Sequence, residues 1–534
     1  MTPARTSGWR SLPSMIDDAA DRFGSKPALV DGEIRLTYKE LAERAGLFGA
    51  ALVTSGIEPG DRVAIWAFNS AEWVIAVLGL LKAGAVLVPV NTRFKGSEAA
   101  DILSRSRAKL LVTVTDFLGT DYVAMLEETG IDLPDLATVV IARGAAVRGT
   151  DSWGDFLVRA TDAALAEVDR RSFDADADDP SDILFTSGTT GFPKGVVQTH
   201  GRTLCVATDW VAMTGLHADD RYLMVNPYFH MFGLKAGILA AVCAGATMIP
   251  QAVFDVDVAL SAVAEEGVTV LPGPPTLYQG ILDHPHRDRY DLSTLRVAVT
   301  GAADIPVELI RRIDGELPFS LVVTGYGLTE AGTAAATLPG DDVETVATTV
   351  GRPRPGFELR IVDGQGSDVA PGATGQIILR GGSVMSHYLD DPAATAEALS
   401  SDGWLRTGDL GTVDPAGYLR IVGRSKDMLI VGGFNAYPAE IENALLRHPH
   451  VRHVAVIGIP DARLGEVAMA FVVMKSGTAG AAADIIGWSR DRMANFKVPR
   501  VVEFVDELPL NATGKVVKDV LRQRAAQRPY GASP

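Results

Sequence analysis

Short apolar, β-branched runs alternate with helix-periodic segments from residue 27 to about residue 300, and this alternation constrains the fold more than any other feature. A run at 62–66 is followed by a helical pattern at 73–82 and a second run at 86–90. Strands that alternate with helices form parallel crossover units, so we predict an α/β fold with mostly parallel sheets. Further strands are expected at 109–114, 138–141, 183–186, 222–225, 246–249, 268–271, 296–300 and 321–324.

The pattern changes twice further along the chain. Between about 345 and 424 the apolar residues recur with period two and glycine-rich turns are frequent, which predicts a mostly β subdomain. After residue 424 a helix at 437–447 is followed by strands at 451–459 and 467–475. We therefore expect an N-terminal domain over 1–424 and a small α+β C-terminal domain over 425–534.

Charge and hydropathy exclude several classes of protein. The net charge of −17 argues against nucleic-acid binding, because phosphate backbones select basic surfaces. The apolar stretches 73–90 and 234–250 contain Lys82 and Lys235 and are predicted to be buried helix-strand units rather than membrane spans. The first residues show no secretory signal, so we expect a cytoplasmic protein without integral membrane association.

A loop rich in serine, threonine and glycine follows the strand at 183–186. Residues 185–195 read FTSGTTGFPKG, in which small residues let the backbone approach a polyphosphate and Lys194 adds a positive charge. The spacing is not that of a Walker A loop, because Lys194 follows Pro193 and precedes Gly195. The composition alone is compatible with an ordinary turn, whereas the full string predicts a nucleotide-phosphate loop.

This string resembles the signature loop of the adenylate-forming superfamily, which includes acyl- and aryl-CoA synthetases, luciferases and peptide-synthetase adenylation domains. Three further strings match in the same order: TGYGLTE at 324–330, WLRTGD at 404–409 and LPLNATGK at 508–515. The resemblance spans nearly the whole chain, although the first 150 residues match only in general pattern. It implies stacked sheets in the large domain and a small, mobile C-terminal domain.

The resemblance also implies an ATP site. Tyr326 would pack on adenine, Asp409 would accept the ribose hydroxyl protons, and Glu330 with Thr186 would bind Mg²⁺. A helix N-terminus at Thr329 and Glu330 is the alternative explanation for that acid. The residues implied to bind ATP are Thr186, Ser187, Gly188, Thr189, Thr190, Gly191, Lys194, Gly301, Ala302, Ala303, Gly325, Tyr326, Gly327, Thr329, Asp409 and Arg424.

By the same resemblance Lys515 is the catalytic lysine of adenylation, delivered when the small domain closes about a hinge at Lys426. His230 and Glu330 complete the catalytic set. Coenzyme A is placed at Gly432 and Gly433. The acyl pocket would be lined by His230, Phe232, Lys235, Ala236, Thr300, Gly325 and Leu328. Acetylation by a lysine acetyltransferase would remove the charge of Lys515, and a homodimer is a further expectation.

These residues suit an acid:CoA ligase that releases AMP and pyrophosphate, with ATP, Mg²⁺ and coenzyme A as cofactors or co-substrates. The acid is expected to be a fatty, alicyclic or steroid-ring-derived propanoate, and the narrower resemblance is to enzymes that activate the propanoate left from the C and D rings of cholesterol. A stand-alone adenylation enzyme that loads a carrier protein, a luciferase-like oxygenase and a non-catalytic binding module are the alternatives. Residues 232–238 contain no aspartate that would hold an amino group, which disfavours activation of an amino acid.

Overall fold

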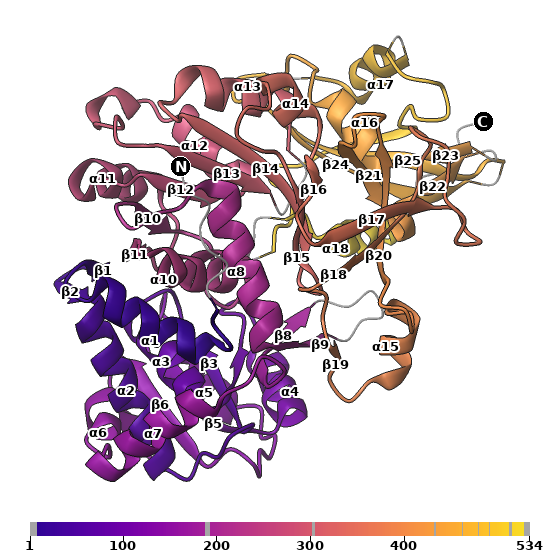
Figure 1. Cartoon of the computed structure of the whole chain (residues 1–534). Coiled ribbons are helices and arrows are strands. Elements are labelled where there is room, and N and C mark those ends of the chain that lie inside the picture. Colours follow the sequence, from indigo (N-terminus) through magenta and orange to yellow (C-terminus); the bar gives the residue numbers. More distant parts are fainter. Residues whose placement is uncertain are drawn as a thin grey trace.

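The computed structural model describes residues 8–186, 193–301, 305–431, 434–461, 463–478, 480–490, 492–511 and 515–527 of the chain (Figure 1). Over these residues no helix combines the length and the apolar character needed to cross a membrane. The apolar stretches at 73–90 and 234–250 form helix-strand units, as predicted.

The first large sheet has nine strands among the described residues, in the order β16-β15-β14-β13-β12-β10-β11-β1-β2. Its central pairs are parallel, whereas β14, β15 and β16 pair antiparallel at one edge and β1 and β2 at the other. The bounds are β1 Pro27–Asp31, β2 Ile34–Thr37, β10 Arg221–Met224, β11 Thr247–Pro250, β12 Val270–Gly273, β13 Val297–Gly301, β14 Leu321–Leu328, β15 Gly332–Ala336 and β16 Arg352–Pro353.

The second large sheet has eight strands in the part of the chain that the structure describes, in the order β19-β9-β8-β4-β3-β5-β6-β7. Strands β4, β3, β5, β6 and β7 are parallel, and β8 and β9 form an antiparallel hairpin at one end. The bounds are β3 Arg62–Trp66, β4 Val86–Pro89, β5 Ala108–Val114, β6 Thr138–Arg143, β7 Asp151–Ser152, β8 Pro180–Thr186, β9 Lys194–Thr199 and β19 His387–Tyr388.

One buried core joins the two sheets. It contains side chains of helices α1, α2, α3, α8, η1 and α10 together with strands of both sheets. Helix α8 runs through the middle of the molecule, between the two sheets (Figure 1). The bounds are α1 Leu12–Phe23, α2 Tyr38–Thr54, α3 Ala71–Lys82, α8 His200–Thr214, α9 Met231–Gly233, η1 Leu234–Leu239 and α10 Ala240–Ala244, of which η1 is a π-helix.

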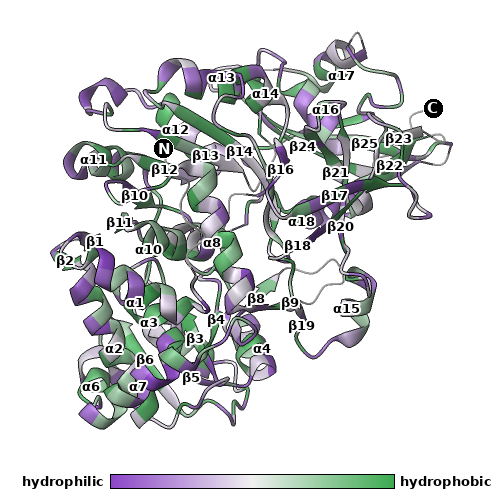
Figure 2. Ribbon diagram, viewed as in Figure 1, coloured by the Kyte–Doolittle hydropathy of each residue, from purple (hydrophilic) through white to green (hydrophobic). Residues whose placement is uncertain are grey.

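Strand β13 shows why the strands of this sheet are continuous apolar runs in the sequence. Val297 and Val299 pack in the shared core, whereas Ala298 between them packs in a second core on the opposite face. Strands covered on both faces read as continuous apolar runs rather than alternating ones. Hydrophobic residues accordingly gather on the strands and on the helix faces beside them (Figure 2). The outer helices are α4 Gly96–Ser106, α5 Tyr122–Glu127, α6 Trp153–Leu157, α7 Asp162–Asp174, α11 Val256–Glu266, α12 Pro275–Leu282, α13 Val307–Glu316 and α14 Val343–Thr348, with the 3₁₀ turn η2 at Arg287–Arg289.

Two smaller sheets follow. The first is antiparallel, with the order β17-β18-β20-β21, in the region where the sequence predicted a β subdomain. The second contains β22 to β26 and has its own core, and it lies beside the first at the C-terminal end of the colour scale (Figure 1). The bounds are β17 Phe357–Val362, β18 Gly375–Gly381, α15 Pro392–Ala398, β20 Leu405–Val413, β21 Leu419–Arg424, η3 Ser425–Asp427, β22 Leu429–Val431, β23 Phe434–Ala436, α16 Pro438–Leu445, β24 Val451–Asp461, β25 Gly465–Met474, α17 Ala482–Arg490, β26 Val501–Phe504 and α18 Lys518–Ala526.

Candidate active site

Two glycines meet at the carboxyl ends of β13 and β14. Gly301 pairs with Gly325 in the parallel ladder, and a Cβ added at Gly301 would lie 3.0 Å from the Gly325 carbonyl oxygen. Ligands in open α/β sheets bind outside the carboxyl ends of strands, where backbone without side chains permits close approach. Both glycines were predicted to border the nucleotide. Ala302 and Ala303, predicted with them, lie outside the described residues.

Three of the residues predicted to bind ATP form one contact group. The Tyr326 hydroxyl donates to Asp409 Oδ2 at 2.5 Å, and Arg424 Nε lies 3.0 Å from Asp409 Oδ1. Asp409 and Arg424 face each other across the β20 and β21 ladder, and Asp409 is only 5% exposed. Burial, and then the neighbouring Asp409 carboxylate, raise the pKa of Tyr326, so its hydroxyl remains a donor. Tyr326 thus orients the Asp409 carboxylate, and the other oxygen of this carboxylate faces Arg424.

Glu330 lies in the turn between β14 and β15 rather than on a helix. The alternative of a helix N-terminus at Thr329 and Glu330 is therefore wrong. The Tyr388 hydroxyl donates to Glu330 Oε1 at 2.9 Å, and the ammonium of Lys194 lies 5.0 Å from the centre of the Tyr388 ring. Tyr388 consequently links the acid of one motif to the lysine of another.

The ends of the predicted phosphate loop are held by the β8 and β9 hairpin. Thr186 pairs with Lys194 across the two strands, and the Thr186 hydroxyl makes a long contact of 3.5 Å to the Lys194 carbonyl oxygen. The Arg105 guanidinium donates to the Pro193 carbonyl oxygen at 2.7 Å, which anchors the start of β9 on helix α4. The predicted residues Ser187, Gly188, Thr189, Thr190 and Gly191 lie outside the described residues.

His230 precedes the short helix α9, and its Nδ1 accepts a hydrogen bond from the Phe232 amide at 3.2 Å. Burial lowers the pKa of His230 to about 4, so the imidazole is neutral near pH 7. The Phe232 ring packs edge-on against Trp210 of α8, with ring centres 5.3 Å apart. A neutral imidazole can orient a carboxylate by one hydrogen bond without titrating.

Thr300 is the next-to-last residue of β13 and is fully buried. Its hydroxyl finds no hydrogen-bond partner among the described residues. A buried hydroxyl without a partner is unfavourable by about 1–3 kcal/mol, which makes it a candidate contact for an oxygen of a bound ligand. Ala236, predicted for the same pocket, is buried in η1, and Leu328 is half-buried at the end of β14.

Lys235 was also predicted for the acyl pocket, but its ammonium is engaged inside the protein. Nζ lies 2.8 Å from Asp182 Oδ1 and donates to Thr203 Oγ1 at 3.0 Å. The Lys235 side chain is 1% exposed, and burial lowers its pKa while the Asp182 charge opposes that shift. A direct contact between this ammonium and a substrate oxygen would require breaking the ion pair, so Thr300 is the better candidate for that contact.

Lys515 and Asn511 contact each other, and Asn511 contacts Arg93, which follows strand β4. The Lys515 amide donates to Asn511 Oδ1 at 2.9 Å, and the Asn511 amide donates to the Lys515 carbonyl oxygen at 2.8 Å. The Arg93 guanidinium donates to the Asn511 carbonyl oxygen at 3.2 Å. Lys515 itself is exposed. Lys426 lies in the short 3₁₀ turn η3 directly after Arg424, whereas Gly432 and Gly433 lie outside the described residues.

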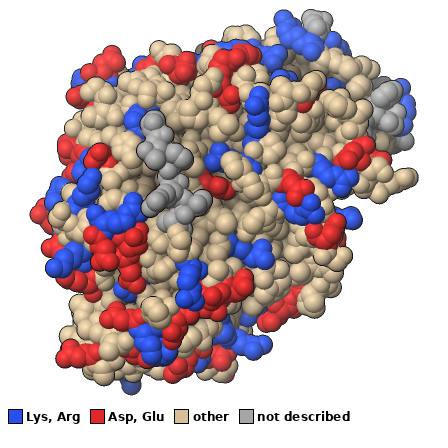
Figure 3. All heavy atoms as spheres, viewed as in Figure 1, with Lys and Arg blue, Asp and Glu red and all other residues tan. Residues whose placement is uncertain are grey.

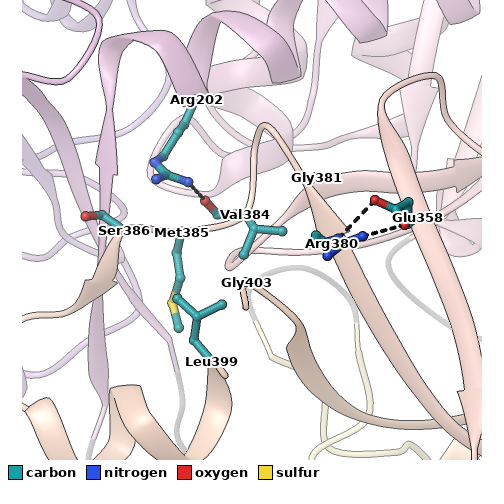
Figure 4. Close-up of a pocket in the computed structure, with 9 residues that line it drawn as sticks. All are labelled: Arg202, Glu358, Arg380, Gly381, Val384, Met385, Ser386, Leu399 and Gly403. Carbon is teal, nitrogen blue, oxygen red and sulfur yellow. Dashed lines mark hydrogen bonds and ion pairs between the residues drawn. The ribbon is translucent and has the colours of Figure 1, made fainter. Parts of the chain in front are cut away.

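A cavity of about 430 Å³ lies beside Met385, a neighbour of Glu330, and not at the predicted ATP or acyl residues. It is bordered by Arg202, which donates to the Val384 carbonyl oxygen, and by Met385, whose amide donates to the Glu330 carbonyl oxygen at 2.6 Å (Figure 4). None of the predicted site residues lines it. On the face drawn in Figure 3, acidic and basic side chains are interspersed, without the broad basic area that nucleic-acid binding requires.

Comparison with known proteins decides the family. Residues 16–389 match the family model described as AMP-binding enzyme, and residues 440–515 match that of the AMP-binding enzyme C-terminal domain. The chain belongs to the AMP-binding enzyme family. Members of this family use ATP, and the chain is an AMP-forming acid:CoA ligase of the adenylate-forming superfamily, as predicted.

Two relatives share the same name, 3-[(3aS,4S,7aS)-7a-methyl-1,5-dioxo-octahydro-1H-inden-4-yl]propanoyl:CoA ligase. The one from Rhodococcus jostii is 49% identical over 516 residues, which cover 96% of this chain and 98% of the relative. The one from Mycobacterium tuberculosis is 49% identical over 515 residues, covering 96% and 99%. The structure of the anthranilate CoA ligase AuaEII with anthranoyl-AMP superposes with a TM-score of 0.88 at 29% identity, over 99% of each chain.

Three residues that contact predicted site residues in the structure were missed in the sequence analysis. Tyr388 contacts Glu330, Arg93 contacts the Lys515 loop, and Asp182 contacts Lys235. Asp182 lies in β8 directly before its apolar residues 183–185, and this signal could have been noticed, because a charge in a buried strand requires a partner. Tyr388 and Arg93 carry no comparable signal in the sequence.

Proposed function

We propose that this ligase activates a compact ring-bearing propanoate with oxygen on its rings, of the 7a-methyl-1,5-dioxo-octahydro-indene type. The hydroxyl of Thr300, which has no hydrogen-bond partner among the described residues, carries this proposal from the structure, because it could donate a hydrogen bond to a ring carbonyl. The names of the two relatives support the same class of acid. Phe232, Ala236 and Leu328 would supply the apolar contacts to the ring body.

The reaction proceeds in two steps. The substrate carboxylate attacks the α-phosphorus of ATP and displaces pyrophosphate, giving an acyl-adenylate. The sulfur of coenzyme A then attacks the acyl carbon, and AMP leaves. Asp409, held by Tyr326 and Arg424, would bind the ribose, and Lys194 with the phosphate loop would bind the phosphates. Lys515 would stabilise the charge that develops in the first step.

Mg²⁺ fits the residues at Glu330. Magnesium is commonly held by one or two carboxylates together with substrate phosphates, and the Glu330 carboxylate is oriented by the Tyr388 hydroxyl. Thr186 would add a hydroxyl ligand. When bound, the ion neutralises charge on the ATP phosphates. His230 would orient the attacking carboxylate as a neutral hydrogen-bonding group.

Several further expectations belong to the same proposal. The small domain, over 425–534, would rotate about Lys426 between the two steps, so that coenzyme A reaches the adenylate near Gly432 and Gly433. Acetylation of Lys515 would remove the charge needed in the first step. A homodimer and a cytoplasmic location complete the proposal.

The decisive experiment measures CoA-dependent AMP release with a panel of acids. The dioxo-indane propanoate, the same acid without ring oxygens, ferulate and palmitate are compared at equal enzyme concentration. We expect the dioxo acid to have the highest kcat/KM, and palmitate turning over about ten times faster would refute the proposal.

Thr300→Val is the matched variant, because valine keeps the shape and removes only the hydroxyl. It should lower the preference for the dioxo acid over the deoxygenated acid, whereas an unchanged preference would remove Thr300 from the pocket. Acyl-adenylate formation without transfer to coenzyme A would instead favour the alternative of loading a carrier protein.

A further inference from the structure

A lysine and an aspartate form an ion pair deep inside the protein. Lys235 Nζ and Asp182 Oδ1 are 2.8 Å apart, and the two side chains are 1% and 3% exposed. Replacing such a buried pair with apolar residues is often neutral or stabilising, because desolvation of two charges offsets their attraction. The pair is therefore weak evidence for stability, and its location needs another explanation.

The pair and the Thr203 hydroxyl between its two members connect three elements. Asp182 Oδ2 accepts hydrogen bonds from Ser181 Oγ at 2.7 Å and from Thr203 Oγ1 at 2.9 Å. Lys235 Nζ donates to the same Thr203 oxygen at 3.0 Å. Strand β8, helix α8 and the π-helix η1 are thus tied together at one point.

Two of these elements lead directly to the reacting groups. β8 ends at Thr186, four residues after Asp182, where the predicted phosphate loop begins. η1 carries Ala236 beside Lys235, and it follows His230 and Phe232 of the predicted acyl pocket. π-helical turns are rare and are frequently found at functional sites.

The buried polar contacts continue toward Glu330. Ser181 Oγ, whose hydrogen is donated to Asp182, lies 3.4 Å from the Gln198 carbonyl oxygen, and Gln198 Nε2 donates to the Ser383 carbonyl oxygen at 3.3 Å. Ser383 Oγ donates to the carbonyl oxygen of Ala331, the residue after Glu330, at 2.7 Å. The hairpin that carries the phosphate loop is therefore also connected to the proposed magnesium ligand.

We propose that the Lys235–Asp182 ion pair is a positioning device for adenylation, which sets the distance between the acyl pocket and the phosphate loop. The pair thereby determines which length of acid places its carboxylate at the α-phosphorus. This inference rests on the proposed function of these two sites. A misplacement of about 1 Å between reacting groups can lower a rate about 10²-fold, so a fixed spacer has a large effect on specificity.

The test uses the double variant Lys235→Met with Asp182→Asn. It removes both charges together, and the asparagine oxygen still accepts from Ser181 and Thr203. ATP–pyrophosphate exchange is measured with the ring propanoate and with its homologues one methylene shorter and longer. We expect kcat/KM for the propanoate to fall about 10-fold, and its preference over the longer homologue to fall at least about 5-fold, with the KM for ATP within about 2-fold.

The matched control is Lys82→Met with Asp17→Asn, which removes another lysine–aspartate pair, between α3 and α1. Lys82 is 7% exposed and the Asp17 side chain 45%, and among the described residues the pair contacts Ser172 rather than a residue of the predicted site. This control should leave the length preference unchanged. A folded Lys235/Asp182 double variant with the wild-type length preference would overturn the proposal and assign the pair to stability alone.

A second variant covers the case in which the double variant does not fold. Thr203→Val keeps the shape and removes the hydroxyl that bridges the pair, so it should shift the length preference in the same direction by a smaller factor. An unchanged preference in folded Thr203→Val would also overturn the proposal. The panel of acids measured with the wild-type enzyme tests the proposed substrate separately. If the enzyme prefers another acid, the length preference is measured with the shorter and longer homologues of that acid.

Discussion

Lys515→Ala should stop the first half-reaction and spare the second. The lysine is proposed to stabilise the charge that develops as the carboxylate attacks the α-phosphorus. Losing one positioned electrostatic donor typically lowers a rate about 10²- to 10³-fold, which corresponds to roughly 2.7–4 kcal/mol of transition-state stabilisation.

Lys515→Ala should keep the main-chain contacts that the structure describes at Lys515 and Asn511. The loop is held by main-chain groups of Lys515, whose amide contacts Asn511 Oδ1 at 2.9 Å and whose carbonyl oxygen accepts from the Asn511 amide at 2.8 Å. Arg93 holds the same loop through the Asn511 carbonyl oxygen at 3.2 Å. Alanine keeps these three main-chain contacts, so a comparison with a charged replacement separates the charge of the lysine from its side-chain packing.

Two half-reactions are measured on one purified variant. ATP–pyrophosphate exchange follows adenylation, and thioester formation from preformed acyl-adenylate and coenzyme A follows the second step. We expect the first rate to fall about 10²- to 10³-fold and the second to stay within about 3-fold. Equal loss in both rates would refute this division of roles and would make Lys515 a residue that supports both steps. Lys515→Arg, which keeps the charge, serves as the control for the size of the side chain.

The remaining predictions concern the metal, the hinge and the effect of pH. Glu330→Gln keeps an oxygen for the Tyr388 hydroxyl, so the fold should persist while the Mg²⁺ concentration for half-maximal exchange rises about 10-fold; unchanged Mg²⁺ dependence would remove Glu330 as a ligand. Lys426→Pro fixes φ near about −65° and should slow thioester formation more than adenylation, whereas equal slowing would contradict the hinge. Burial lowers the pKa of His200 to about 4, below its unfolded value of about 6.5, so only the unfolded state binds the extra proton between these values. The free energy of unfolding should therefore decrease as the pH is lowered from 7.5 to 5, and His200 should account for a loss of about 2 kcal/mol at pH 5. Urea unfolding at the two pH values should show a smaller decrease for His200→Gln than for the wild type.

The sequence was sufficient for most of the parallel strands and for the order of the motifs, whereas strands such as β2 and β9 were not predicted. β3 at Arg62–Trp66 matches its predicted range and β17 at Phe357–Val362 lies in the predicted β subdomain, because runs of β-branched and apolar residues are a local signal. The phosphate loop could be predicted because small residues and a lysine lie next to each other in the chain. A motif formed by neighbouring residues in the sequence does not depend on how distant segments pack.

Only the tertiary structure decided which side chains meet. The Tyr326 hydroxyl reaches an acid 83 residues away, and the Tyr388 hydroxyl reaches one 58 residues away. Lys235 was predicted to be a polar group of an apolar pocket, but in the folded chain its ammonium lies beside Asp182 of β8. Such contacts depend on strand order and on the side of a helix that faces a sheet. Local patterns leave both open, since the same strands and helices can be connected in more than one order.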